Sequence, residues 1–298
     1  MSQATWIEVR LLVPARMQEE ASLFLTEFSG RGVILEEDPA GGEGAVLRAF
    51  FRAEEFGAWQ QDELQSYLSR LREHELYPLG LEIRQAAEDD WAEAWKVHFK
   101  PVKVTPHLVI RPPWEDYEPA PGETVLVVYP GMAFGTGRHP TTLLCLQALE
   151  QVWEDMTQLG PPGAWQVLDV GTGTGILALA AARLGAKVLA IDVDPEAVNA
   201  ALENVRLNAL EDLIWVETTP INALRQQFAL ILANLTAADL DHWAEALAGR
   251  TLPGGTLIIS GFLTQDLPTM AARFAQYGLT EAGHLTQEEW SALILRRA

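Results

Sequence analysis

The stretch VLDVGTGTGILALAAARLG, residues 167–185, decides the fold. An apolar strand runs into a turn with glycines at 171, 173 and 175, and a helix rich in alanine and leucine follows. The dinucleotide-binding fingerprint G-x-G-x-x-G would require glycine at position 176, which is Ile176. Glycines lack a Cβ atom, so the backbone of this turn can lie directly against a ligand. The stretch therefore predicts a strand–turn–helix unit whose turn either binds a ligand or serves only as a tight connection between the strand and the helix.

Strand-like runs continue on both sides of this unit. They are TVLVV, QVLDV, KVLAID, LIWVE, FALILAN and GTLIIS, and they alternate with helical stretches from about Val125 onward. This alternation predicts a mostly parallel sheet with helices on both faces. Because such sheets bind ligands beyond the carboxyl ends of their strands, we expect the functional side chains just after each apolar run.

Two polar residues stand at such strand ends. Asp192 follows KVLAI, where a carboxylate can accept hydrogen bonds from both hydroxyls of a ribose, in an NAD site as well as in others. Asp194 competes for this role, but Pro195 after it favours a helix cap. Asn234 ends FALILAN, where its amide could either orient an amine or cap the next helix.

The first part of the chain forms a separate pattern. Residues 1–85 read as β-α-β-β-α-β, which predicts a small ferredoxin-like α+β domain. Residues 86–105 contain Trp91 and Trp95 four positions apart, and we interpret this segment as a connecting helix and linker. Residues 106–298 form the predicted catalytic domain.

Composition limits the possible partners and compartments. The 298 residues carry a formal net charge of −20, which disfavours free nucleic acid as partner and indicates either attraction of a basic protein or only high solubility. Cys145 is the only cysteine, and the histidines are scattered, so neither a disulfide nor a metal site is expected. No signal peptide or membrane-spanning run is visible, and a cytoplasmic protein is the expectation. Without a long heptad repeat, we also expect a monomer.

The motifs, taken together, carry a resemblance. PGMAFGTGRHPTT, LDVGTGTGILALAA, AIDVDPEAV, LILANL, PGGTLIISGFL and EEWSALILRR follow one another along the chain. In this order they resemble the methyltransferases of large-subunit ribosomal protein eleven, which are class I enzymes dependent on S-adenosylmethionine. The resemblance covers nearly the whole chain and is strongest over 88–298.

The resemblance implies a fold, a reaction and a set of contacts. The fold would be a Rossmann-like seven-stranded sheet behind the small N-terminal domain. The reaction would be methylation, with trimethylation as the expected end point, of lysine side-chain and N-terminal amines of that ribosomal protein. Cofactor contacts would fall on Thr142, Gly171, Asp192 and Asn234, with Asn234 also orienting the amine. Gly173 and Gly175 line the same turn by the glycine argument.

Some positions depart from the family pattern or allow two roles. Tyr129 stands where the family often has aspartate, and Leu235-Thr236 replaces isoleucine-leucine after Asn234. His139 could act as a base, although a lone loop histidine more often braces its loop. Phe99 and Phe134 are candidate walls of a roomy amine pocket. The segment VYPGMAFGTGRHPTT, 128–142, is interpreted as a lid over the methyl donor.

Other functions stay open at this stage. A class I methyltransferase acting on another protein or on a small amine would share the same core motifs. An NAD-linked oxidoreductase is less favoured because of Ile176 and Asn234. A non-catalytic binding module on this fold is disfavoured by the joint presence of the glycines, Asp192 and Asn234.

Overall fold

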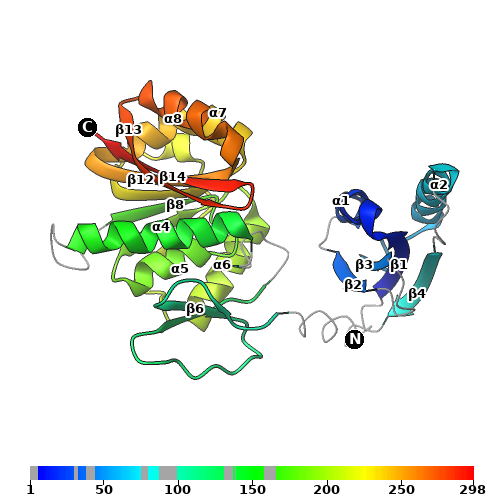
Figure 1. Ribbon diagram of the computed structural model, residues 1–298. Coiled ribbons are helices and arrows are strands. Elements are labelled where there is room, and N and C mark those ends of the chain that lie inside the picture. The colour runs from blue at the N-terminus through cyan, green and yellow to red at the C-terminus, as the bar shows by residue number, and fades with distance from the viewer. Residues whose placement is uncertain are drawn as a thin grey trace. The chain divides into compact units, whose positions relative to one another are not determined.

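The computed structural model describes residues 6–29, 33–37, 44–74, 80–86, 99–130, 137, 139–157 and 166–298. The chain divides into two compact units, residues 1–98 and 99–298, which Figure 1 shows in blue to cyan and in green to red. The boundary falls within the predicted connecting segment 86–105. The tryptophan-bearing part of that segment, 87–98, lies outside the described residues. The division at 85 and 105 and the connecting helix therefore stay predictions.

The N-terminal unit is a sheet with two helices on one face. Its elements in chain order are β1 (Trp6–Pro14), η1 (Ala15–Met17), α1 (Gln18–Ser29), β2 (Ile34–Glu37), β3 (Gly44–Arg52), α2 (Ala58–His74) and β4 (Gly80–Ala86). The strands pair antiparallel in the order β2-β3-β1-β4. This arrangement confirms the ferredoxin-like pattern.

Each strand of this unit buries one face. Val9, Leu11, Leu47 and Ala49 pack with residues of both helices, including Leu25 of α1 and Leu64 and Leu68 of α2. Alternate residues point to the other face, where Glu8 bonds to Arg48 and Arg84. Burial alone would raise the pKa of Glu8, but the bonds from the two guanidinium groups lower it.

The second unit contains a seven-stranded sheet. Its strands are β8 (Gln166–Val170), β9 (Lys187–Ile191), β10 (Ile214–Glu217), β11 (Phe228–Asn234), β12 (Thr251–Leu263), β13 (Leu279–Gln287) and β14 (Trp290–Arg297). They lie in the order β10-β9-β8-β11-β12-β14-β13. Pairing is parallel from β10 to β12 and antiparallel across β12, β14 and β13.

One predicted member of this sheet lies elsewhere. The run TVLVV forms β7 (Thr124–Val127), which belongs to a three-stranded sheet with β5 (Val102–Lys103) and β6 (Leu108–Arg111). β6 pairs with β7 on one side. On the side of β7 away from β6, side chains take the place of a further strand. There the backbone N–H groups of Val127 and Tyr129 donate to the side chains of Asn208 and Asn204 at 3.0 and 2.7 Å. The C-terminal hairpin β13–β14 completes the seven strands.

Helices cover both faces of the large sheet. α4 (Pro140–Thr157), α5 (Ile176–Arg183) and α6 (Pro195–Leu207) contribute to the core on one face, and α7 (Ala237–Arg250) and α8 (Leu267–Ala275) to the core on the other. Among the described residues, this unit also has the short helices η3 (Ile221–Ala223) and η4 (Thr264–Asp266). Because the central strands are buried on both faces, they read as continuous apolar runs.

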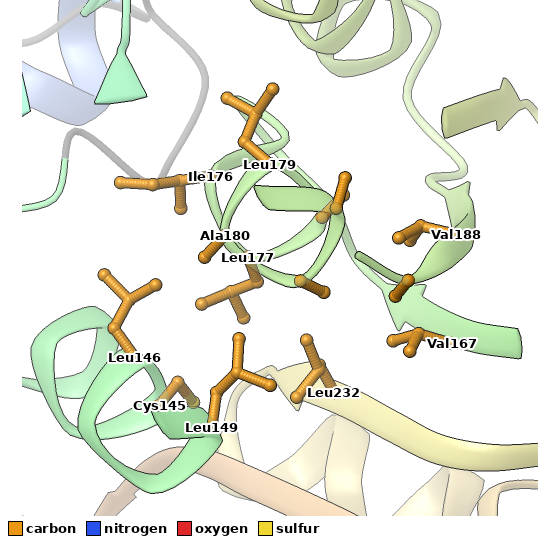
Figure 2. Packing of buried hydrophobic residues seen from close by; sticks show 14 of the residues in the cluster. Cys145, Leu146, Leu149, Val167, Ile176, Leu177, Leu179, Ala180, Val188 and Leu232 are labelled. Carbon is orange, nitrogen blue, oxygen red and sulfur yellow. The ribbon is translucent and has the colours of Figure 1, made fainter. Parts of the chain in front are cut away.

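Figure 2 shows the core on the α4 side, where Cys145 and Leu149 of α4 lie with Leu177 of α5 and Leu232 of β11. Cys145 is 0% exposed, as its predicted place in the core requires. Burial raises the pKa of its thiol. Among the helices that the structure describes, none is long and apolar enough to cross a membrane.

Candidate active site

A cavity of about 580 Å³ opens at the carboxyl ends of the parallel strands. The turn after β8, the residues after β9, the end of β11 and the start of α7 all border it. Its wall also includes His139 before α4 and Trp290 at the start of β14. This is the edge of an α/β sheet at which ligands bind, and the volume is typical of a small-molecule site.

The glycine-rich turn forms the floor of the cavity. Gly171 and Gly173 border it, and the Gly171 N–H donates to the carbonyl of Ile191 at 2.9 Å. Gly175 is not among the described residues that border the cavity. A Cβ atom at Gly175 would lie 3.2 Å from the Cβ atom of Ala201, so this glycine allows α5 and α6 to pack closely. Only part of the glycine motif therefore faces the ligand space.

Asp192 connects the turn to the end of β9. Its Oδ2 atom accepts the Gly173 N–H at 3.0 Å, and its Oδ1 atom accepts the Asp194 N–H at 3.0 Å. Each carboxylate oxygen has a further lone pair for a ligand hydroxyl. Asp194 also borders the cavity, but it caps α6 by accepting the Glu196 N–H at 2.9 Å. The predicted helix cap is thus confirmed.

Asn234 ends β11 beside the cavity. Its Nδ2 group donates to Thr142 Oγ1 at 3.3 Å, and its Oδ1 atom is buried with no hydrogen-bond partner among the described residues. Thr236, rather than Asn234, caps α7 by accepting the Asp239 N–H at 3.2 Å. The amide oxygen of Asn234 is therefore available to a ligand. Buried polar atoms are normally paired, so an orphan at a cavity wall indicates a missing partner.

Thr142 lies next to Asn234, away from the cavity wall that the described residues form. Its side chain is 0% exposed and it is not among the described residues that border the cavity. Its hydroxyl oxygen accepts the hydrogen bond from the Asn234 side-chain amide. Direct donation of this hydroxyl to a methyl donor stays a prediction, while the contact with Asn234 is visible in the structure.

His139 braces the start of α4. Its backbone carbonyl accepts the N–H groups of Thr142 and Leu143 at 3.0 and 3.2 Å. Its ring Nδ1 lies 2.8 Å from Thr141 Oγ1, and the ring meets that of Trp290 edge-on with centroids 5.0 Å apart. Desolvation lowers the pKa of His139, against the opposing effect of Glu288 and Glu289. These contacts match the bracing role, on a residue that also borders the cavity.

Asp169 supports the glycine turn from below. Its Oδ2 atom accepts the Thr172 hydroxyl at 2.6 Å and the Ala178 N–H at 3.1 Å. Burial raises the pKa of this carboxyl to about 7. The acidic residue that opens the motif therefore shapes the turn.

A model of the family described as "Ribosomal protein L11 methyltransferase (PrmA)" matches residues 5–298. The chain belongs to the ribosomal protein L11 methyltransferase family. Members from Pelobacter propionicus and Geobacter sulfurreducens are each 40% identical to it, and each alignment covers 98% of both chains.

A crystal structure from the family shares the fold. The ribosomal protein L11 methylase from Lactobacillus delbrueckii subsp. bulgaricus is 33% identical, with a TM-score of 0.60 over 67% of this chain and all of that one. Membership in the family confirms the class I methyltransferase fold and the methyltransferase activity predicted above. It decides against the NAD-linked oxidoreductase.

Several residues of the site carry no signal that identifies them in the sequence. Gly261, Trp243, Ile221 and Trp290 border the cavity. Gly261 and Trp290 lie within quoted motifs of the family, but no residue type or spacing assigned them a role. Phe99, a predicted wall residue, borders a separate small hollow beside Ile110. Its companion Phe134 lies outside the described residues.

Proposed function

We propose that this protein transfers methyl groups from S-adenosylmethionine to amines of ribosomal protein L11. Support comes from the family match over residues 5–298 and from relatives that carry this name and align over 98% of both chains. The observation that carries the proposal is the Asn234 amide oxygen, buried without a partner among the described residues at the wall of the cavity.

The residues around the cavity fit this methyl donor. Gly171 and Gly173 present bare backbone to the cavity, and Asp192 retains lone pairs for the two hydroxyls of a ribose. Mostly apolar neighbours, among them Val193 and Ile221, suit a purine ring. When bound, S-adenosylmethionine supplies an electrophilic methyl carbon on a sulfonium that departs as a neutral thioether.

Positioning of the amine is the main task of the chain. The Asn234 oxygen can accept an N–H bond from the incoming amine, which directs the nitrogen lone pair toward the methyl carbon. Correct orientation of two reactants can supply several kcal/mol of the rate acceleration. No oxyanion needs stabilisation because the leaving group is neutral.

The attacking amine must first lose its proton. A lysine amine has an unperturbed pKa near 10.4 and an α-amine one near 8. Transfer into a mostly apolar cavity lowers an amine pKa, so the proton can pass to water before the amine docks. His139 is not required as a base in this mechanism.

We propose trimethylation as the end point, on lysine side chains and on the N-terminal amine. A trimethylated nitrogen has no N–H left, so Asn234 cannot hold the product by the bond that oriented the substrate. Trp290 and Trp243 border the cavity and offer aromatic faces on which a methylated cation can rest.

The N-terminal unit is proposed to recognise the ribosomal protein. It has a hydrophobic core of its own, so its removal leaves the catalytic core intact. Deleting 1–85 should abolish methylation of ribosomal protein L11 while binding of S-adenosylhomocysteine persists. Efficient methylation by the truncated enzyme would refute this role.

Mass spectrometry of ribosomal protein L11 after incubation with enzyme and S-adenosylmethionine tests the function. We expect mass gains in whole methyl steps, located on lysine and N-terminal amines. Asn234→Ala should retain the fold and lose most of the activity, while Thr236→Ser, two residues on, keeps its capping hydroxyl and serves as the matched control. An unmodified ribosomal protein would overturn the proposal.

A further inference from the structure

Gly261 lies where the large sheet changes register. It falls between Ser260 and Phe262, at the irregularity in the pairing of β12 with β14. Its φ of +100° is in the region that favours glycine, and the residue borders the cavity. A bulge of this kind next to a site is a means of redirecting the chain.

The space beside Gly261 is filled by the backbone of Leu235. A Cβ atom at position 261 would lie 2.0 Å from the carbonyl oxygen of Leu235, 2.7 Å from its carbonyl carbon and 3.2 Å from its nitrogen. These are main-chain atoms, so no side-chain rotation can relieve the overlap. The Leu235 N–H also donates to the carbonyl of Ser260 at 3.0 Å, which holds this peptide against β12.

A second glycine contacts Leu235 from the other side. At Gly171, with φ of +68°, an added Cβ atom would lie 2.4 Å from the Cδ2 atom of Leu235. Leu235 thus contacts a glycine that follows β8 through its side chain and a glycine within β12 through its backbone. Asn234 immediately precedes it, so any displacement of the Leu235 peptide moves the Asn234 amide.

We propose that Gly261 is a positioning residue for methyl transfer. The missing side chain lets the Leu235 peptide lie against β12, and this contact sets where the Asn234 oxygen meets the amine. The inference rests on the proposed function, in which Asn234 orients the acceptor. A displacement of about 1 Å at a reacting group can cost on the order of 10²-fold in rate.

The turn proposed to bind the donor touches the Leu235 side chain at Gly171, but hydrogen bonds hold its backbone in place. The turn is tied to β9 by the bonds from Gly171 to Ile191 and from Gly173 to Asp192. None of these bonds involves Leu235. Substitution of Gly261 should therefore impair transfer far more than it impairs donor binding.

Gly261→Ala is the test variant, and Gly254→Ala is its control. Gly254 lies on the same strand with φ of +73°, but an added Cβ atom there would meet nothing within 4 Å. The control thus carries the same kind of backbone strain without the contact. Titration calorimetry with S-adenosylhomocysteine gives donor-site affinity, and single-turnover methylation of ribosomal protein L11 gives the transfer rate.

We expect Gly261→Ala to lower the transfer rate by about 10²-fold and to leave the affinity for S-adenosylhomocysteine within about threefold, a change of well under 1 kcal/mol. Gly254→Ala should leave both unchanged. Because Gly261 acts through Asn234, adding Gly261→Ala to Asn234→Ala should cause little further loss.

Each contrary result has a distinct meaning. A Gly261→Ala enzyme that transfers methyl groups as fast as the Gly254→Ala enzyme overturns the inference. So does one that has lost its fold or its affinity for S-adenosylhomocysteine, since Gly261 would then serve the whole domain. If the unmodified enzyme does not methylate ribosomal protein L11, the proposed function itself fails.

Discussion

Replacement of Thr142 by valine separates two possible roles of its hydroxyl. Valine has nearly the shape of threonine, so the fully buried site stays filled while the hydroxyl is lost. If the hydroxyl serves Asn234, the Asn234 Nδ2 group loses the acceptor that it now has at 3.3 Å. If the hydroxyl serves the methyl donor, the donor loses a contact and Asn234 keeps its orientation.

The expected magnitude follows from the length of this bond. An unsatisfied buried donor costs about 1–3 kcal/mol, and a bond of 3.3 Å is longer than the usual range, so we expect about 1 kcal/mol. A loss of about 1 kcal/mol in the preference for the productive amide orientation corresponds to roughly a fivefold lower kcat. Affinity for S-adenosylhomocysteine should change little.

Single-turnover methylation and titration calorimetry on the same preparation distinguish the two roles. Thr142→Ser is the matched control, because it retains the hydroxyl and removes only a methyl group. It should keep kcat near the original value at a modest cost in thermal stability. A Thr142→Val enzyme with intact kcat and tenfold weaker binding of S-adenosylhomocysteine would refute the role through Asn234 and support direct contact with the donor.

Further substitutions test Asp192 in the proposed donor site, Asp169 beneath the glycine turn, and His139 before α4. Asp192→Ala should weaken binding of S-adenosylhomocysteine by more than about tenfold, since hydrogen bonds to a charged group contribute about 1.5–3 kcal/mol; calorimetry that finds unchanged affinity would remove Asp192 from the site. Asp169 binds a proton in the folded state up to about pH 7 but in the unfolded state only below about pH 4. Its contribution to stability therefore falls as pH rises through that window, by roughly 1.4 kcal/mol per pH unit. Asp169→Asn should abolish this fall in denaturant titrations at several pH values, and a slope equal to that of the original protein would contradict the raised pKa. His139→Ala should lower activity by loosening the start of α4, yet the rise of kcat/KM with pH should persist because it reports deprotonation of the amine; loss of that rise would identify His139 as the base.

The architecture is predictable because its physical causes are local. Strands buried on both faces are mostly apolar along their length, and polar residues such as Asp192 and Asn234 stand out where such strands end. The carboxyl ends of parallel strands meet at one edge of the sheet. The convergence of these residues can therefore be predicted even when the positions of the helices are unknown. The reaction is predicted from the family motifs, because hydrophobic periodicity predicts secondary structure and carries no information about chemistry.

Pairing partners are less predictable, as β7 shows. TVLVV has the composition of a central strand, but the side chains of Asn204 and Asn208 occupy the backbone groups that another strand would need. Asn204 lies on α6 and Asn208 directly follows it, 75 and 81 residues away from the groups that they bind. The residues around β7 in the sequence therefore cannot show that distant side chains bind its backbone in place of a neighbouring strand.

Close contacts within the site are equally hidden. The glycine at 261 is plain in the sequence, yet only the structure shows that its missing Cβ atom makes room for the Leu235 carbonyl. Likewise Thr142 is 92 residues from Asn234, and nothing near either residue announces their bond. Residues proposed to touch a ligand are easier to predict from a sequence than the residues that hold those ligand-binding residues in place.

The two halves of the site are consequently built in different ways. The proposed donor half consists of backbone groups and one carboxylate, joined by hydrogen bonds between adjacent strand ends, and each bond fixes its own geometry. The acceptor half depends on one amide at a strand end, and its orientation is set by the Thr142 hydroxyl and by the packing of Leu235 against Gly261. Packing contacts tolerate little change because a closely packed interior leaves no room for added atoms or shifted backbone. Substitutions around Asn234 should therefore produce enzymes that bind the donor and fail to transfer its methyl group, whereas substitutions around Asp192 should weaken donor binding first.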